Sequence, residues 1–178
     1  MSVRNKKEDK DAAPEELLEV MDPLNRPLAV ISRTQVHFQG LFHRSVAVLA
    51  YDGNKRIYLN KRSAACVLYP GRWTLSASGH VLPGEAVVEA AHRRLKIEVG
   101  AVPRRLKLIH IIKGCGETNY EFVYLFSAGQ LIFSPRPDPE QVQDFAFFDK
   151  KDLGEMVWEF PENLTPRVVY FWRLGLIF

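Results

Sequence analysis

Residues 79–100 read G-H-V-L-P-G-E-A-V-V-E-A-A-H-R-R-L-K-I-E-V-G, a segment that begins and ends on glycine. Within it, apolar side chains recur at three- and four-residue spacing, the period of a helix with one buried face: Val87, Val88, Ala91, Leu95 and Val99. Pro83 and Gly84 precede this pattern and Gly100 follows it, as is common at helix boundaries. The spacing therefore predicts an amphipathic helix over residues 85–99, entered from a glycine-containing loop.

The charged side chains of this helix form two pairs. Arg94 and Glu98 are four residues apart, so they lie one turn apart on the same face. Arg93 lies about two turns from Glu85 on one side of the helix, and we expect it to hold Glu85 as a structural pair where the loop enters the helix. Taken alone, an ordinary solvated face with a salt bridge explains these charges.

Short β-rich runs flank the helix on both sides. Strands are predicted over residues 17–21, 28–32, 43–51, 56–61, 73–78, 106–112, 120–127 and 145–148. The run 52–54, Asp-Gly-Asn, predicts a hairpin between two of them, whereas residues 33–42 are predicted to be a polar linker. Helices are predicted over 150–158 and 165–174, the second opened by Thr165 and Pro166. This order predicts an α+β fold, in the form of an α/β/α sandwich.

Composition limits the function classes. The 178 residues, 47% of them hydrophobic, suffice for one domain, placed at 17–178, whereas residues 1–16 are mostly charged or polar and are predicted to be a disordered tail. The net charge of +3 suits an anionic ligand, but the scattered basic residues argue against a nucleic-acid partner. Two cysteines and strand-length apolar runs predict neither a disulfide framework nor a membrane span, so a cytoplasmic protein is expected.

The segment 79–100 also resembles the signature of the Nudix superfamily, G-x5-E-x7-R-E-U-x-E-E-x-G, where U is aliphatic. Six positions agree in register: Gly79, Glu85, Arg93, Leu95, Glu98 and Gly100. Arg94 and Ile97 stand where the signature has glutamates, so only Glu98 remains of the metal-binding acids. The resemblance implies a Nudix-type sandwich with a mixed sheet, and a divalent metal, Mg²⁺ or Mn²⁺, held against a small diphosphate substrate.

Neighbouring residues resemble one branch of that superfamily, the isopentenyl-diphosphate isomerases and the bacterial Nudix hydrolases related to them. The matches are His37 and His43 before a strand, residues 69–74 leading to 78–80, and residues 93–98. On this resemblance a metal is bound by His37, His43, His80 and Glu121, and Glu121 also moves a proton. Glu98 matches a helix carboxylate that also binds metal, a second cation bridged to the diphosphate. Arg62 matches a diphosphate-binding arginine, and Arg72 and Arg94 are expected to add positive charge around the substrate.

Four matched positions depart from the isomerases. Ser78 replaces the cysteine that protonates the alkene, and a hydroxyl is far less acidic than a thiol, so Ser78 is left as a substrate-binding candidate. Arg167 replaces a tryptophan that faces a cationic intermediate, and an arginine there opposes the positive charge. Asn119 replaces a metal-binding glutamate, and Cys66 a substrate-binding lysine. Isomerisation is therefore disfavoured.

Three functions stay open from the sequence. The leading hypothesis is a metal-dependent hydrolase of an X-diphosphate, a nucleoside or related diphosphate, in which Glu98, Glu121 and Glu140 hold metal and orient water. The second is an isopentenyl-diphosphate isomerase-like enzyme, which the histidines favour. The third is a non-catalytic module that binds a diphosphate, which the loss of acids at Arg94, Ile97 and Asn119 favours.

Overall fold

The computed structural model describes residues 15–100, 103 and 105–178, so the tail predicted over residues 1–14 lies outside the described residues. One nine-stranded sheet forms the centre of the molecule. Its strands are β1 (Leu17–Met21), β2 (Pro27–Ser32), β3 (His43–Tyr51), β4 (Ile57–Arg62), β5 (Trp73–Thr74), β6 (Ala77–His80), β7 (Lys107–Ile112), β8 (Glu121–Gln130) and β9 (Val142–Phe148). The helices are α1 (Arg33–Phe38), α2 (Val87–Glu98), α3 (Lys150–Glu159) and α4 (Pro166–Arg173), with 3-10 turns at Gly116–Thr118 and Pro161–Asn163.

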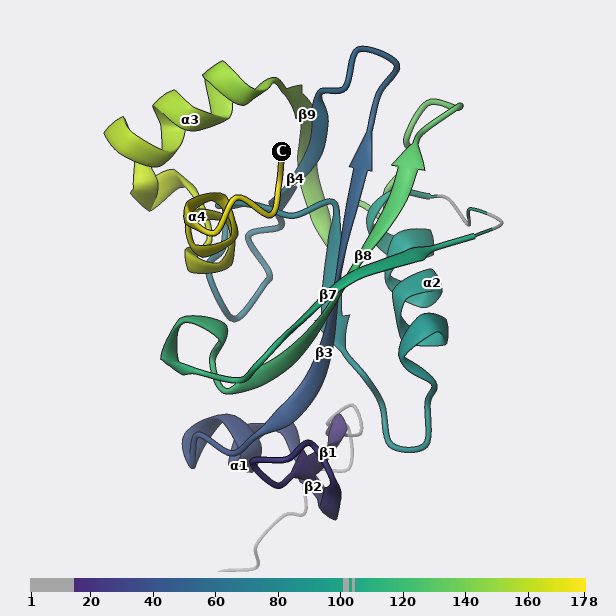
Figure 1. The fold of residues 1–178 in the computed structure, drawn as a ribbon, viewed down its shortest axis with the longest axis vertical. Coiled ribbons are helices and arrows are strands. Elements are labelled where there is room, and N and C mark those ends of the chain that lie inside the picture. Colours follow the sequence, from purple (N-terminus) through teal and green to yellow (C-terminus); the bar gives the residue numbers. More distant parts are fainter. Residues whose placement is uncertain (1–14, 101–102, 104) are drawn as a thin grey trace, which may run out of the picture.

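Strand β3 is buried on both faces because it lies in the middle of the sheet. It pairs in parallel with β8 and antiparallel with β6. Side chains alternate along a strand, so Ala47 and Leu49 face the core shared with α3 and α4, whereas Val46 and Val48 face the core shared with α2. Figure 1 shows α2 on one side of the sheet and α3 with α4 on the other. The predicted α/β/α sandwich with a mixed sheet is confirmed.

The predicted central helix forms as α2, with Ala90, Ala91 and Leu95 buried against the sheet. Gly100 follows the helix with a φ of +76°, a left-handed conformation that favours glycine. A Cβ on Gly100 would lie 2.2 Å from the backbone oxygen of Arg136. The last glycine of segment 79–100 is therefore required both by its backbone conformation and by the close approach of another chain segment.

We expect Gly100→Ala to lower the free energy of unfolding by about 3 to 4 kcal/mol, the sum of the left-handed penalty and an overpacking cost. Gly84 is the matched control, because its φ is +75° but a Cβ added there would meet nothing within 4 Å. Gly84→Ala should cost only about 1 to 2 kcal/mol. Urea unfolding of both variants measures the difference, and equal losses would contradict the close contact with Arg136.

Two predictions from the sequence are wrong. Residues 33–38, predicted to lie in a polar linker, form helix α1, which the Ser32 side chain caps by accepting a hydrogen bond from the Gln35 amide. Only Val36 of that helix is buried, so its sequence shows no helical period. The predicted strand 73–78 is two strands, β5 and β6, because its first half pairs with β4 and its second half with β3.

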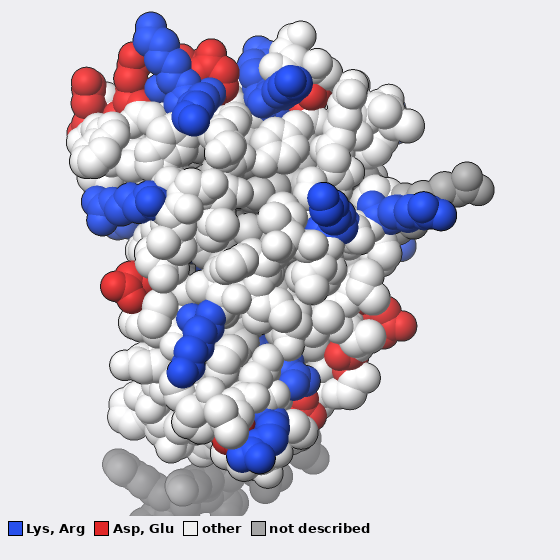
Figure 2. Space-filling view, viewed as in Figure 1, with Lys and Arg blue, Asp and Glu red and all other residues white. Residues whose placement is uncertain are grey.

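Charge on the surface agrees with the absence of a basic stripe in the sequence. On the face drawn in Figure 2, lysine and arginine side chains are scattered over several places, and some at the top lie beside acidic side chains. None of the helices in the described part of the chain has the length and apolar character needed to cross a membrane.

Candidate metal centre and anion-binding cleft

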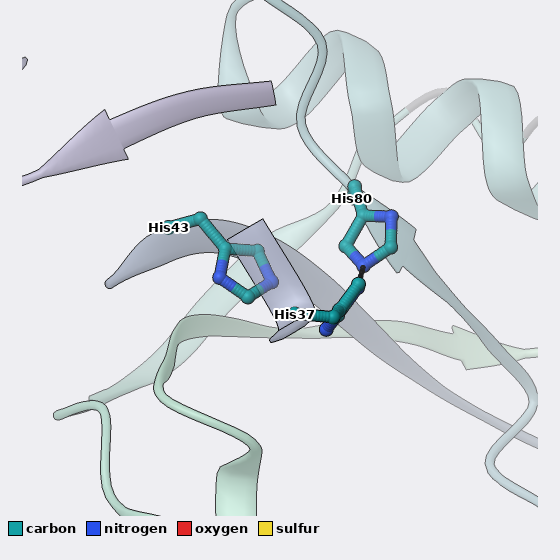
Figure 3. A group of neighbouring side chains, drawn as sticks. All are labelled: His37, His43 and His80. Carbon is teal, nitrogen blue, oxygen red and sulfur yellow. Dashed lines mark hydrogen bonds between the residues drawn. The ribbon is translucent and has the colours of Figure 1, made fainter. Parts of the chain in front are cut away.

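Three histidines from separate elements converge at the end of the sheet. His37 lies on α1, His43 begins β3, and His80 ends β6 (Figure 3). One side-chain nitrogen from each forms a group within 4.8 Å of one another, and Nε2 of His37 lies 3.2 Å from Nε2 of His80. Metal–imidazole bonds of about 2.0 to 2.1 Å place two neighbouring ligand nitrogens roughly 3 Å apart, close to the separation of these two Nε2 atoms. The structure therefore brings together the three histidines that the sequence proposed as ligands.

The other nitrogen of each ring, Nδ1, contacts a neighbouring group. His43 Nδ1 lies 2.9 Å from the Leu41 carbonyl oxygen, and His80 Nδ1 lies 3.4 Å from Glu16 Oε1. His37 Nδ1 lies 3.5 Å from the side-chain amide of Asn119. By contrast, His43 Nε2 is buried and has no hydrogen-bond partner among the described residues. A buried nitrogen without a partner, beside two others, fits a bound cation.

The charges of the centre also fit a cation. Burial lowers the pKa of His37 to about 4, helped by its neighbours His80 and His43, and burial likewise lowers the pKa of His43. These imidazoles are therefore neutral near pH 7 and keep the lone pair that a metal needs. For Glu121, burial opposes ionisation, but its surroundings, the Arg167 guanidinium first among them, lower the pKa to about 2.

Glu121 faces the histidines and an arginine at once. It is the first residue of β8 and pairs in register with His43, so its Oε1 lies 3.9 Å from His43 Nε2. Its other oxygen, Oε2, accepts a hydrogen bond from Arg167 on α4. Asn119 and Tyr120, which precede Glu121, have φ values of +61° and +60°, so two consecutive left-handed residues direct the chain into the site.

A cleft of about 380 Å³ opens beside this centre. Five arginines line it: Arg33, Arg62, Arg93, Arg94 and Arg167. Four of them pair with glutamates, in the pairs Arg33–Glu16, Arg93–Glu85, Arg94–Glu98 and Arg167–Glu121. Arg62 donates from Nε to the Leu68 carbonyl and has no ion pair with a described carboxylate. The cleft therefore offers an arginine whose charge is not balanced by its own ion pair.

Glu98 lies apart from the histidine group, and its two oxygens are occupied. Oε1 accepts hydrogen bonds from Arg94 and from the backbone amide of Ser78, and Oε2 accepts one from Asn60. Arg94 also donates to the Ser78 carbonyl. A Cβ on Gly79 would lie 2.7 Å from the Arg94 side chain, so the first glycine of the segment makes room for this arginine. Arg94 and Glu98 thus fasten strand β6 to α2.

The predicted pair of Glu85 and Arg93 is confirmed. Arg93 donates to both oxygens of Glu85, at 2.7 and 2.8 Å, and also to the His80 carbonyl at 2.9 Å. Glu85 accepts a further bond from the Leu82 amide. These contacts hold the backbone at His80, the end of β6, and the turn into α2 in one arrangement, so this pair supports the position of a metal-centre residue.

Other predicted site residues lie elsewhere. Glu140 is exposed, and neither it nor Arg72 belongs to the described lining of the cleft. The Arg72 guanidinium lies 5.4 Å from the centre of the Tyr69 ring and donates to the Leu164 carbonyl. Ser78 does line the cleft. Two lining residues, Glu16 and Arg33, were missed because composition placed Glu16 in the tail and Arg33 in the linker.

Comparison with known proteins shows the family of this chain. Over residues 41–170 the sequence matches the NUDIX domain family. The chain belongs to the Nudix family. The isopentenyl-diphosphate Delta-isomerase of Streptomyces griseus is 32% identical over 146 residues, which span 78% of this chain and 74% of that protein. The isopentenyl-diphosphate Delta-isomerase 2 of Photorhabdus laumondii is 28% identical over 155 residues, or 85% of this chain and 87% of that protein.

Solved structures share the Nudix fold. DR0079 of Deinococcus radiodurans superposes with a TM-score of 0.78 and 16% identity, over 89% of this chain and 98% of that one. The MutT protein of Methanosarcina mazei Go1 gives a TM-score of 0.60 and 17% identity, over 74% of this chain and 91% of that one. At these identities the likeness shows the architecture, and the resemblance that segment 79–100 indicated is confirmed at the level of the family.

Proposed function

We propose that this Nudix-family chain is a metal-dependent hydrolase of an X-diphosphate compound, with its metal bound by His37, His43, His80 and Glu121. One observation carries the proposal: three imidazole nitrogens cluster beside a cleft lined by arginines, and the carboxylate of Glu121 lies 3.9 Å from one of them. Histidine with carboxylate suits Mn²⁺, and a bound metal of this kind polarises a phosphoryl oxygen and makes water a nucleophile near neutral pH.

The chain's own residues have distinct parts in this proposal. Arg62 binds the diphosphate, because its charge is not matched by an ion pair of its own. Besides binding the metal, Glu121 accepts a proton from the attacking water, because its Oε1 lies 3.9 Å from His43 Nε2, beside the metal centre. Arg94 and Glu98 hold strand β6, which ends at His80, against α2, because Arg94 bonds both Glu98 and the Ser78 carbonyl. Leu68 and Tyr69 line the cleft near Arg62 and contact the group X.

Isomerisation of isopentenyl diphosphate is the second candidate, because the curated relatives carry that name. Two features of the cleft argue against it. Ser78 offers a hydroxyl where the isomerases have an acidic thiol, and Arg167 fixes a positive charge against Glu121. A positive charge beside a developing carbocation raises its energy, whereas the same charge stabilises a phosphorane-like anion. The ion pair of Arg167 therefore favours hydrolysis.

Product analysis separates the candidates. The purified chain is incubated with Mn²⁺ and either a panel of nucleoside diphosphates and sugar nucleotides or isopentenyl diphosphate, and products are followed by phosphorus NMR. We expect phosphate or a monophosphate from at least one member of the panel, and no conversion of isopentenyl to dimethylallyl diphosphate. Formation of dimethylallyl diphosphate without phosphate release would contradict hydrolysis, and tight ligand binding with no product would instead support a binding module.

A further inference from the structure

Glu16 reaches the metal centre from outside the segment that matches the family. It directly precedes β1, and its carboxylate bridges two cleft residues: Oε1 lies 3.4 Å from His80 Nδ1, and Oε2 lies 3.1 Å from Arg33. A backbone bond from the Arg33 amide to the Glu16 carbonyl, at 2.8 Å, fixes the two segments together. Glu16 is therefore held at its backbone and at both side-chain oxygens.

The contact with Glu16 determines which nitrogen of His80 is available to a metal. A neutral imidazole carries one proton, and a carboxylate at Nδ1 keeps that proton on Nδ1 and leaves the lone pair on Nε2. Nε2 of His80 is the atom that lies 3.2 Å from Nε2 of His37. For His43 a backbone carbonyl has the same effect, so among the three histidines His80 is the one whose outer contact in the described chain is a carboxylate.

We propose that Glu16 is a positioning residue for the metal centre, which fixes the ring of His80 so that its Nε2 points at the other two histidines. This inference rests on the proposed metal-dependent function. It assigns residues 15–38, which precede the family match at 41–170, a direct part in the site, since they supply both Glu16 and His37.

An ordinary surface ion pair does not account for this arrangement. Glu16 with Arg33 alone would be such a pair, because their side chains are 34% and 38% exposed, and exposed pairs contribute little to stability. The side chain of His80 is only 11% exposed and lies within the centre, so its contact with Glu16 acts on the site itself. Removing Glu16 should therefore affect metal affinity more than it affects folding.

Metal affinity, measured by titrating the metal-free full chain with Mn²⁺ in a calorimeter, tests this role. We expect Glu16→Ala to raise the dissociation constant about 10- to 100-fold and Glu16→Gln to fall between it and the original chain, because glutamine keeps an acceptor oxygen but loses the charge. Glu19→Gln is the matched control. Glu19 is a glutamate of β1 whose partner is Arg44, outside the cleft lining, so its variant should bind Mn²⁺ as the original chain does.

The outcomes are distinct. In one outcome the original chain binds Mn²⁺, and the dissociation constant of Glu16→Ala differs from it by less than about twofold, far less than the loss of an outer partner typically causes. Glu16 then has no positioning role, and the metal centre stands without it. If the original chain does not bind Mn²⁺, the metal centre fails and the role of Glu16 fails with it. Circular dichroism checks that each variant is folded. If Glu16→Ala is unfolded, the dissociation constant of Glu16→Gln relative to that of the original chain decides whether Glu16 positions His80. The electron paramagnetic resonance spectrum of bound Mn²⁺ should also change in Glu16→Gln and not in Glu19→Gln.

Discussion

Replacing Glu121 with glutamine is expected to lower kcat for diphosphate hydrolysis about 10³-fold, the middle of the range for loss of a proton-accepting group. Glutamine keeps the size of the side chain and an oxygen for Arg167, but it neither carries the negative charge nor accepts the proton. The loss should therefore appear in kcat, measured by steady-state phosphate release, while thermal unfolding shows that the variant is folded.

Glu117 provides the control for this variant. It also lines the cleft but belongs to the 3-10 turn 116–118 and makes no contact with the histidines among the described pairs. Glu117→Gln should retain activity within about twofold, as expected of a residue outside the reacting groups. A folded Glu121→Gln variant with more than about a tenth of the original kcat would contradict the assignment of Glu121 as the proton acceptor.

Replacing Arg62 with alanine should raise KM about 10- to 100-fold with little change in kcat. A hydrogen bond to a charged group contributes about 1.5 to 3 kcal/mol, which corresponds to this range, since about 1.4 kcal/mol changes an equilibrium constant tenfold. The increase falls on KM if Arg62 binds the substrate and its transition state equally well. Kinetics over a range of substrate concentrations separate the two constants.

Arg72→Ala is the matched control for Arg62. The sequence proposed both arginines as substrate-binding residues, but the structure places Arg72 against Tyr69 and the Leu164 carbonyl, outside the described lining of the cleft. Its loss should change KM less than about threefold, the effect of a residue that makes no charged bond to substrate. If Arg72→Ala weakens substrate binding more than Arg62→Ala does, the diphosphate lies elsewhere in the cleft.

Much of the fold follows from local sequence patterns. The helical period of residues 85–99 and the glycine after it predict α2. The spacing of apolar side chains determines which helix face is buried, and the left-handed residue after the helix favours glycine, so both features are visible in the local sequence. Strand β3 is predicted over its observed length for a similar reason, since every residue from Ser45 to Ala50 is buried. Helix α1 was missed because its position depends on one buried side chain, Val36, and on a serine cap.

The site was predictable only in part. The three histidines were found together through family resemblance, since nothing in their spacing brings residues 37, 43 and 80 to one point without the pairing of β3 with β6. Glu98 was expected to bind metal from the family resemblance alone. The sequence could not show that its oxygens accept hydrogen bonds from Asn60 and the Ser78 amide, because these partners come from distant strands. Glu16 was missed for the same reason: its contacts with Arg33 and His80 are made by the fold, whereas composition placed it at the end of a polar tail.

The central claim is that His37, His43 and His80 form one metal site with Glu121, and a titration of the metal-free chain with Mn²⁺ tests it most directly. We predict one tight site per chain, weakened more than about 100-fold in His43→Ala, the upper end of the loss caused by disturbing a ligand's surroundings. His92→Ala is the control, because the Nε2 of His92 is also buried without a partner among the described residues, but His92 lies on α2 outside the histidine group. Equal Mn²⁺ affinity in the original chain and in folded His43→Ala would contradict the claim.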